Sequence, residues 1–89
     1  MKDYKSEGNS LRAQIKELII EFMKSNYACQ PNAEGLTQSD IFRACGLDWG
    51  DQEKAESTKQ QYWVIAVLRV LENEGKVQRD VMSKRWRVT

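Results

Sequence analysis

The residues of this chain best suited to binding chemistry are basic side chains near its C-terminus. Residues 76–89 carry five Lys or Arg against one acidic residue, a net charge of +4. Residues 1–75 carry nine Lys or Arg and twelve Asp or Glu, a net charge of −3. Such a local excess of positive charge could neutralise phosphate groups. The candidate cations of this segment are Arg79, Lys84, Arg85 and Arg87.

A second set of candidates lies on the helix predicted just before these cations. The stretch 57–75 has apolar residues at helical spacing, and its polar residues fall mainly on the opposite side. Lys and Arg can contact phosphate or guanine, Gln can pair with adenine, and Thr can reach either kind of group. The candidates on this helix are Thr58, Lys59, Gln61, Tyr62 and Arg69.

Each of these groups also has a purely structural interpretation. Lys59 and Arg69 could be ordinary solvated side chains on an outer helix face. Arg85 and Arg87 could only protect the edge of a sheet from pairing with another chain. Met82, at the tip of the predicted turn, could insert into a nucleic-acid groove or simply be exposed.

The elements that must position these residues follow from the same stretch. Val64, Val67, Leu68 and Leu71 form the stripe that should be buried. Gly75 suits the left-handed position that ends such a helix. Two segments after it, 76–79 and 85–88, alternate in the period of strands and predict a hairpin. Val77, Trp86 and Val88 form its apolar face.

The first half of the chain predicts two further helices. One runs from a cap at Asn9 or Ser10 to about Asn26. The other begins at Thr37, with Asp40 three residues later, and ends at Gly46. The inward residues of the first are Leu11, Ile15, Leu18, Ile19 and Phe22, and those of the second are Ile41, Phe42 and Cys45. Between the two helices, Leu36 could form a very short strand.

The length of the chain, 89 residues, predicts one domain over 10–89 after a flexible N-terminus at 1–9. The connection 48–56 is polar and acidic, and the third helix could begin within it, as early as Gly50 or Asp51. Its one large apolar residue, Trp49, could be a lid on the core or an exposed contact. Three helices with a hairpin packed on them make an α+β fold.

Composition excludes several kinds of chemistry. The chain has no histidine, which removes the usual general base and histidine-ligated metals, and it has only two cysteines, Cys29 and Cys45. The acidic residues follow no catalytic or metal-binding spacing, so we expect neither an enzyme nor a metal or cofactor. No apolar run approaches a membrane span and the first residues do not form a signal peptide, so we expect a cytoplasmic protein.

These elements resemble the winged helix-turn-helix family. LTQSDIFRACGL is similar to the first helix of the motif, STKQQYWVIAVLRVLENEGKV to the second, and VQRDVMSKRWRV to the wing. The resemblance implies a three-helix winged helix-turn-helix with a C-terminal two-stranded β wing and a possible third short strand near Leu36. The sequence departs from the common pattern in the long connection between Gly46 and Ser57.

The resemblance also implies a function. Its expected partner is double-stranded DNA, with the third helix in the major groove and the basic wing on the backbone or in the minor groove. A small transcriptional regulator or a DNA-targeting domain would fit, as would a nucleoid-associated location in a bacterium and a possible homodimer. The alternative is a winged helix that binds another protein and no nucleic acid, for which Trp49, Tyr62 and Trp63 are the apolar candidates.

Overall fold

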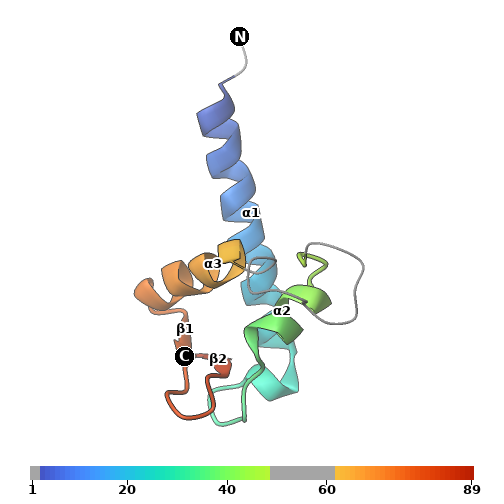
Figure 1. Ribbon diagram of the computed structural model, residues 1–89, viewed down its shortest axis with the longest axis vertical. Coiled ribbons are helices and arrows are strands. Elements are labelled where there is room, and N and C mark those ends of the chain that lie inside the picture. Colours follow the sequence, from blue (N-terminus) through green and yellow to red (C-terminus); the bar gives the residue numbers. More distant parts are fainter. Residues whose placement is uncertain (1–2, 49–61) are drawn as a thin grey trace.

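The computed structural model describes residues 3–48 and 62–89. Over these residues the chain is a small α+β domain with three α-helices and a two-stranded antiparallel sheet. The N-terminal half of α1 projects from one end of the molecule, and the turn of the hairpin lies at the other end (Figure 1). The elements in order are α1 (Tyr4–Ser25), the 3-10 helix η1 (Tyr27–Cys29), α2 (Gln38–Ala44), α3 (Tyr62–Asn73), β1 (Val77–Arg79) and β2 (Trp86–Val88).

Helix α1 begins earlier than the sequence analysis predicted. Asp3 is its N-cap, and the Asp3 side chain accepts a hydrogen bond from the backbone N–H of Ser6 at 3.2 Å. This bond satisfies one of the free N–H groups of the first turn, so the helix can start at Tyr4. The predicted cap at Asn9 or Ser10 is wrong, because both residues lie inside the helix.

The predicted buried face of α1 is confirmed in part, since Ile19 is in the core and Ile15 and Phe22 are partly buried against it. Ile19 and Met23, four residues apart, are fully buried, whereas Leu11 and Leu18 are 55% and 42% exposed. The prediction that Leu11 and Leu18 point inward is therefore wrong. Helix α1 contacts α2 and β2 over its C-terminal half, while its N-terminal half extends beyond them (Figure 1).

The ends of α2 confirm the predicted capping residues. The hydroxyl oxygen of Thr37 accepts a hydrogen bond from the backbone N–H of Asp40 at 3.2 Å. After the helix, Gly46 has a φ of 69° and the backbone N–H of Leu47 donates to the carbonyl oxygen of Phe42 at 2.8 Å. This bond is that of a Schellman cap, which needs a left-handed residue at its turn.

One core joins the helices to the sheet. Leu68 and Leu71 of α3 are fully buried and Val67 is partly buried, as predicted, while the side chain of Val64 lies outside the described part of the chain. The predicted inward face of the hairpin is confirmed: Val77, Trp86 and Val88 are all buried. The strands pair antiparallel, with Val77 opposite Val88, Gln78 opposite Arg87 and Arg79 opposite Trp86.

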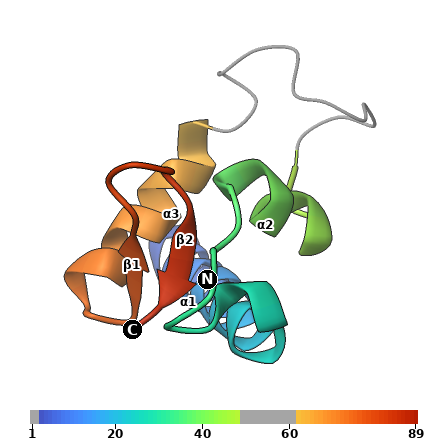
Figure 2. The ribbon, with the colours of Figure 1, turned by 90° about the horizontal axis from the view of Figure 1, so that it is seen from below.

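The third short strand expected near Leu36 is present only as an isolated antiparallel bridge. The backbone N–H of Leu36 donates to the carbonyl oxygen of Trp86 at 3.1 Å, and the N–H of Trp86 donates back at 2.8 Å. The segment that leads into α2 therefore lies alongside β2 (Figure 2).

Several predictions fall on residues 49–61, outside the described residues. They concern the role of Trp49 and the start of the third helix near Gly50 or Asp51. The described part of α3 begins at Tyr62. Its C-terminal end is as predicted: Gly75 has a φ of 75°, and the N–H of Lys76 donates to the carbonyl oxygen of Leu71 at 3.0 Å.

Candidate nucleic-acid interface

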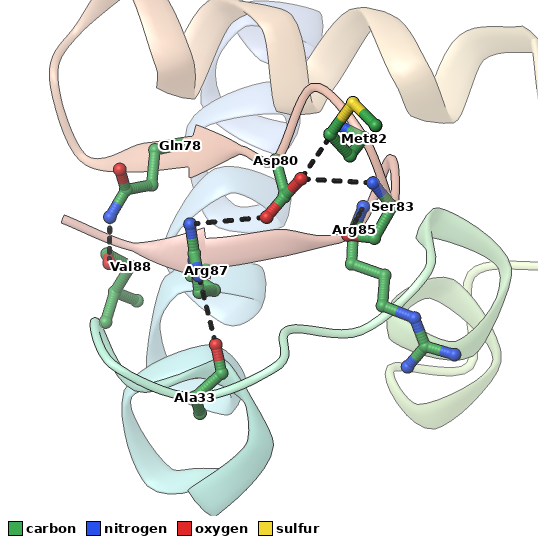
Figure 3. Close-up of polar contacts among 8 residues, drawn as sticks. All are labelled: Ala33, Gln78, Asp80, Met82, Ser83, Arg85, Arg87 and Val88. Atoms are coloured by element: carbon green, nitrogen blue, oxygen red, sulfur yellow. Dashed lines mark hydrogen bonds and ion pairs between the residues drawn. The ribbon is translucent and has the colours of Figure 1, made fainter.

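The turn between β1 and β2 is organised by Asp80. One carboxylate oxygen of Asp80, Oδ1, accepts hydrogen bonds from the backbone N–H groups of Met82 at 2.8 Å and Ser83 at 3.0 Å (Figure 3). The N–H of Lys84 donates to the carbonyl oxygen of Asp80 at 2.8 Å, and Lys84 adopts a φ of 61°. Hydrogen bonds from Ser83 and Met82 and the charge of Arg87 lower the pKa of Asp80.

This turn presents a short row of exposed side chains to solvent. Val81 and Met82 are almost fully exposed, and Lys84 is exposed beside them. A left-handed conformation is uncommon for a residue with a Cβ atom, and Asp80 holds Lys84 in it through the backbone. The tip of the hairpin is thus a fixed loop with one accessible ammonium group.

Arg87 faces the interior of this region more than the solvent. Its Nη1 donates a hydrogen bond to the carbonyl oxygen of Ala33 at 3.1 Å (Figure 3). Its Nη2 lies 3.9 Å from Oδ2 of Asp80, and its side chain is 23% exposed. Arg87 therefore connects β2 to both the loop before α2 and the hairpin turn.

Arg85 makes a parallel contact two residues earlier. Its Nη1 donates to the carbonyl oxygen of Gly35 at 3.3 Å. Arg85, just before β2, and Arg87, within it, both hold the segment that contains Ala33 and Gly35. That segment runs very close to β2, since a Cβ atom on Gly35 would lie 2.8 Å from the carbonyl oxygen of Trp86.

Arg69 and Arg79 are both close to the ring of Trp86. The Cζ atoms of the two arginines lie 5.4 Å and 5.7 Å from the ring centroid, within the range of a cation–π contact. Arg69 also donates from Nη1 to Oε1 of Glu72 at 2.9 Å. The structure thus brings a predicted helix residue and a predicted hairpin residue onto one buried aromatic ring.

The remaining predicted helix residues cannot be placed. Thr58, Lys59 and Gln61 lie outside the described residues, and Tyr62 is described only as the first residue of α3. Within the described part of α3, Ala66 and Arg69 are both exposed.

The face built by the hairpin has mixed charge. A hollow of about 310 Å³ is lined by Glu34, Asp80, Ser83, Arg85 and Arg87. Sequence reasoning identified its two arginines but missed their partners. Backbone carbonyl oxygens carry no residue signature, so no pattern in the sequence points to Ala33 or Gly35.

Other kinds of site find no support among the described residues. No group of three or more Cys, Asp or Glu side chains is placed to hold a metal ion in the described part of the chain. Burial raises the pKa of the Cys29 and Cys45 thiols, and the nearby Cys45 raises that of Cys29 further. Raised values keep both thiols protonated at neutral pH, which disfavours a nucleophilic role.

Comparisons of the chain with protein-family models, with curated proteins and with solved structures found no match. The interpretation of this surface therefore depends on its own residues. None of the helices described here combines the length and apolar character that crossing a bilayer requires.

Proposed function

We propose that this chain is a double-stranded DNA-binding module with a winged-helix arrangement, acting as a small transcriptional regulator or as a DNA-targeting domain. The observation that carries the proposal is the hairpin that directly follows α3 and holds an exposed lysine, Lys84, at its tip. The segment 76–89, which contains the hairpin, carries the net charge of +4 that a phosphate backbone attracts.

In this proposal α3 lies in the major groove and the hairpin contacts the backbone beside it. Lys84 supplies a phosphate contact without breaking a side-chain contact within the chain, because its side chain is exposed. Arg85 has five N–H donors, and its bond to the carbonyl oxygen of Gly35 uses only one of them. Arg87 is more enclosed, so its main role is to support the hairpin.

A second candidate function is binding to another protein. It is favoured by the large exposed fractions of Val81 and Met82 at the hairpin tip. It is also favoured by the four arginines of the interface, which all contact other parts of the same chain. Clustered apolar side chains on a fixed loop are typical of a protein contact.

A charge variant of the hairpin tip tests the proposal. Lys84→Asn removes the ammonium group, and Asn tolerates the φ of 61° found at this position. We expect Lys84→Asn to weaken binding to a labelled random duplex at low salt while the fold stays intact. The matched control is Lys24→Gln, which removes the same charge from an exposed position of α1, outside the hairpin.

Two outcomes would count against the proposal. Equal DNA affinity for Lys84→Asn and the unmodified chain would exclude the hairpin tip from the interface. If the unmodified chain ignores DNA at low salt and a purified protein partner loses affinity for Met82→Asp, the second function is favoured instead.

A further inference from the structure

We propose that α1 is a dimerisation helix, through which two copies of this chain pair side by side and in parallel. The inference rests on α1 and the adjoining surface of α3 and does not depend on DNA binding. Its starting point is a stripe of exposed apolar side chains along α1, formed by Tyr4, Leu11 and Leu18.

The stripe follows the spacing of a two-stranded coiled coil. Apolar or small residues recur along α1 at alternating steps of four and three residues, an average of about 3.5. In heptad terms, the a positions are Gly8, Ile15 and Phe22, and the d positions are Tyr4, Leu11 and Leu18. The repeat continues for nearly three heptads within one helix, Tyr4–Ser25.

The d positions of this seam lie apart from the face that α1 buries in its own domain, whereas the a positions Ile15 and Phe22 are partly buried against the core. The fully buried residues Ile19 and Met23 define the core-facing side. Leu18 precedes Ile19 by one residue, which rotates its side chain by about 100° around the helix axis. The exposed members of the seam, Tyr4, Gly8, Leu11 and Leu18, therefore lie on a flank of α1 that the domain leaves open.

The apolar surface continues from the seam onto α3. A groove of about 390 Å³ is lined by Gly8, Leu11 and Ile15 of α1 and by Ala66, Val67 and Val70 of α3, with Arg12 and Lys16 also in its lining. Val70 is itself exposed. A partner helix lying along the seam would also cover this groove. The buried contact would then include residues of α3 as well as those of α1.

The charges beside the seam favour a second copy of this same helix in parallel orientation. The e positions hold Lys5, Arg12 and the core residue Ile19, and the g positions hold Glu7, Gln14 and Glu21, so the charges that can pair lie in the first heptads. A parallel pair places each g residue near the e residue of the partner five positions later, so Glu7 faces the partner's Arg12. An antiparallel pair would instead place basic e positions opposite each other.

The positions of the two domains are compatible with this pairing. A two-fold axis parallel to the helices turns one copy by 180° relative to the other. Since the core-facing side of α1 is about 100° from the seam, the two domains fall on opposite sides of the helix pair. The projecting N-terminal half of α1 is accessible for the contact (Figure 1).

A gain-of-contact variant gives the first test. A Cβ atom on Gly8 would meet nothing within 4 Å, so Gly8→Ile starts without a clash in the single chain and places an apolar side chain at the empty a position. We expect sedimentation equilibrium to show a monomer–dimer equilibrium for the unmodified chain. Gly8→Ile should lower the dimer dissociation constant by about tenfold or more, because each copy buries an additional Ile side chain.

The control is Ser10→Ile, which adds the same side chain at an exposed position off the seam. It should leave the dissociation constant unchanged, while Leu11→Glu should abolish the dimer. The proposal would be overturned if both the unmodified chain and Gly8→Ile remain monomeric at several hundred micromolar, on the order of the concentrations where weak dimers form. Equal tightening by Ser10→Ile would overturn it too.

A cross-link tests the orientation. A parallel pair places position 4 of the two copies next to each other, so Tyr4→Cys should form an interchain disulfide under mild oxidation. Ser10→Cys, outside the seam, should not. A dimer that forms no disulfide at position 4 would exclude the parallel arrangement.

Discussion

Arg87 donates a hydrogen bond from Nη1 to the carbonyl oxygen of Ala33 at 3.1 Å, across 54 positions of the sequence. Together with the contact of its Nη2 to Asp80, at 3.9 Å, this bond connects three segments: the loop before α2, strand β2 and the hairpin turn. Arg85 donates a similar hydrogen bond to the carbonyl oxygen of Gly35, at 3.3 Å. The hairpin is therefore attached to the domain by arginine side chains as well as by its buried apolar face.

Removing the Arg87 guanidinium should weaken the fold. Arg87→Ala should lower the free energy of unfolding by about 1.5–3 kcal/mol, the range for a hydrogen bond to a charged group. Urea unfolding followed by circular dichroism measures this change. Lys76→Ala is the control, because Lys76 is exposed and its ion pair with Glu74 is long, at 3.8 Å; its effect should stay within about 0.5 kcal/mol. Equal effects of both changes would contradict the role given to Arg87.

Gly46 and Gly35 both have a positive φ, but replacing each by alanine should lower the free energy of unfolding by different amounts. Gly46 has a φ of 69° and open space around a Cβ atom, so Gly46→Ala should cost only the conformational penalty, about 1–2 kcal/mol. Gly35 has a φ of 85°, and its Cβ atom would collide with the carbonyl oxygen of Trp86 at 2.8 Å. Gly35→Ala should therefore destabilise the chain clearly more than Gly46→Ala in urea unfolding. The reverse order would show that the segment around Gly35 does not lie against β2.

The lowered pKa of Asp80 predicts a loss of stability in acid. Hydrogen bonds from Ser83 and Met82 favour the charged carboxylate in the folded chain. Because the folded pKa is below the unfolded one, this stabilisation is complete above the ordinary aspartate value and disappears as the pH falls through the folded pKa. Asp80→Asn keeps an acceptor oxygen but does not titrate in this range.

Urea midpoints measured between about pH 7 and about pH 3 test this prediction. The decrease in midpoint over that range should be smaller for Asp80→Asn than for the unmodified chain. Parallel decreases would mean that the Asp80 carboxylate contributes nothing to the acid dependence.

Local signals in the sequence predicted the ends of the short elements. Thr37 with Asp40, and the glycines Gly46 and Gly75, act within a few residues of themselves, and the structure confirms all three caps. The hairpin was also predictable, since Val77, Trp86 and Val88 alternate with polar residues and are all buried.

The inward face of α1 was harder to predict. Its apolar residues form two overlapping sets: Ile19 and Met23 face the core, and Leu11 and Leu18 remain exposed. Periodicity shows that a helix has apolar faces but does not show which partner covers each one. The start of α1 was missed because Asp3, the actual cap, precedes a polar turn that lacks apolar periodicity.

The candidate interface was predicted only in part, because its contacts are long-range. The sequence identified the basic hairpin, but the acceptors of Arg85 and Arg87 are backbone carbonyl oxygens 50 and 54 residues away, at Gly35 and Ala33. The contact of Arg69 and Arg79 with Trp86 likewise depends on the packing of α3 against β1.

The most direct test of the proposed function is the salt dependence of DNA binding. Fluorescence anisotropy of a labelled random duplex with the purified chain, between about 20 and about 200 mM salt, measures how many phosphates are neutralised. Contacts by Lys84, Arg85 and the outer side of α3 predict a slope of log K against log salt of about −2 to −4. Absence of binding at the lowest salt concentration would contradict a DNA-binding role for this chain.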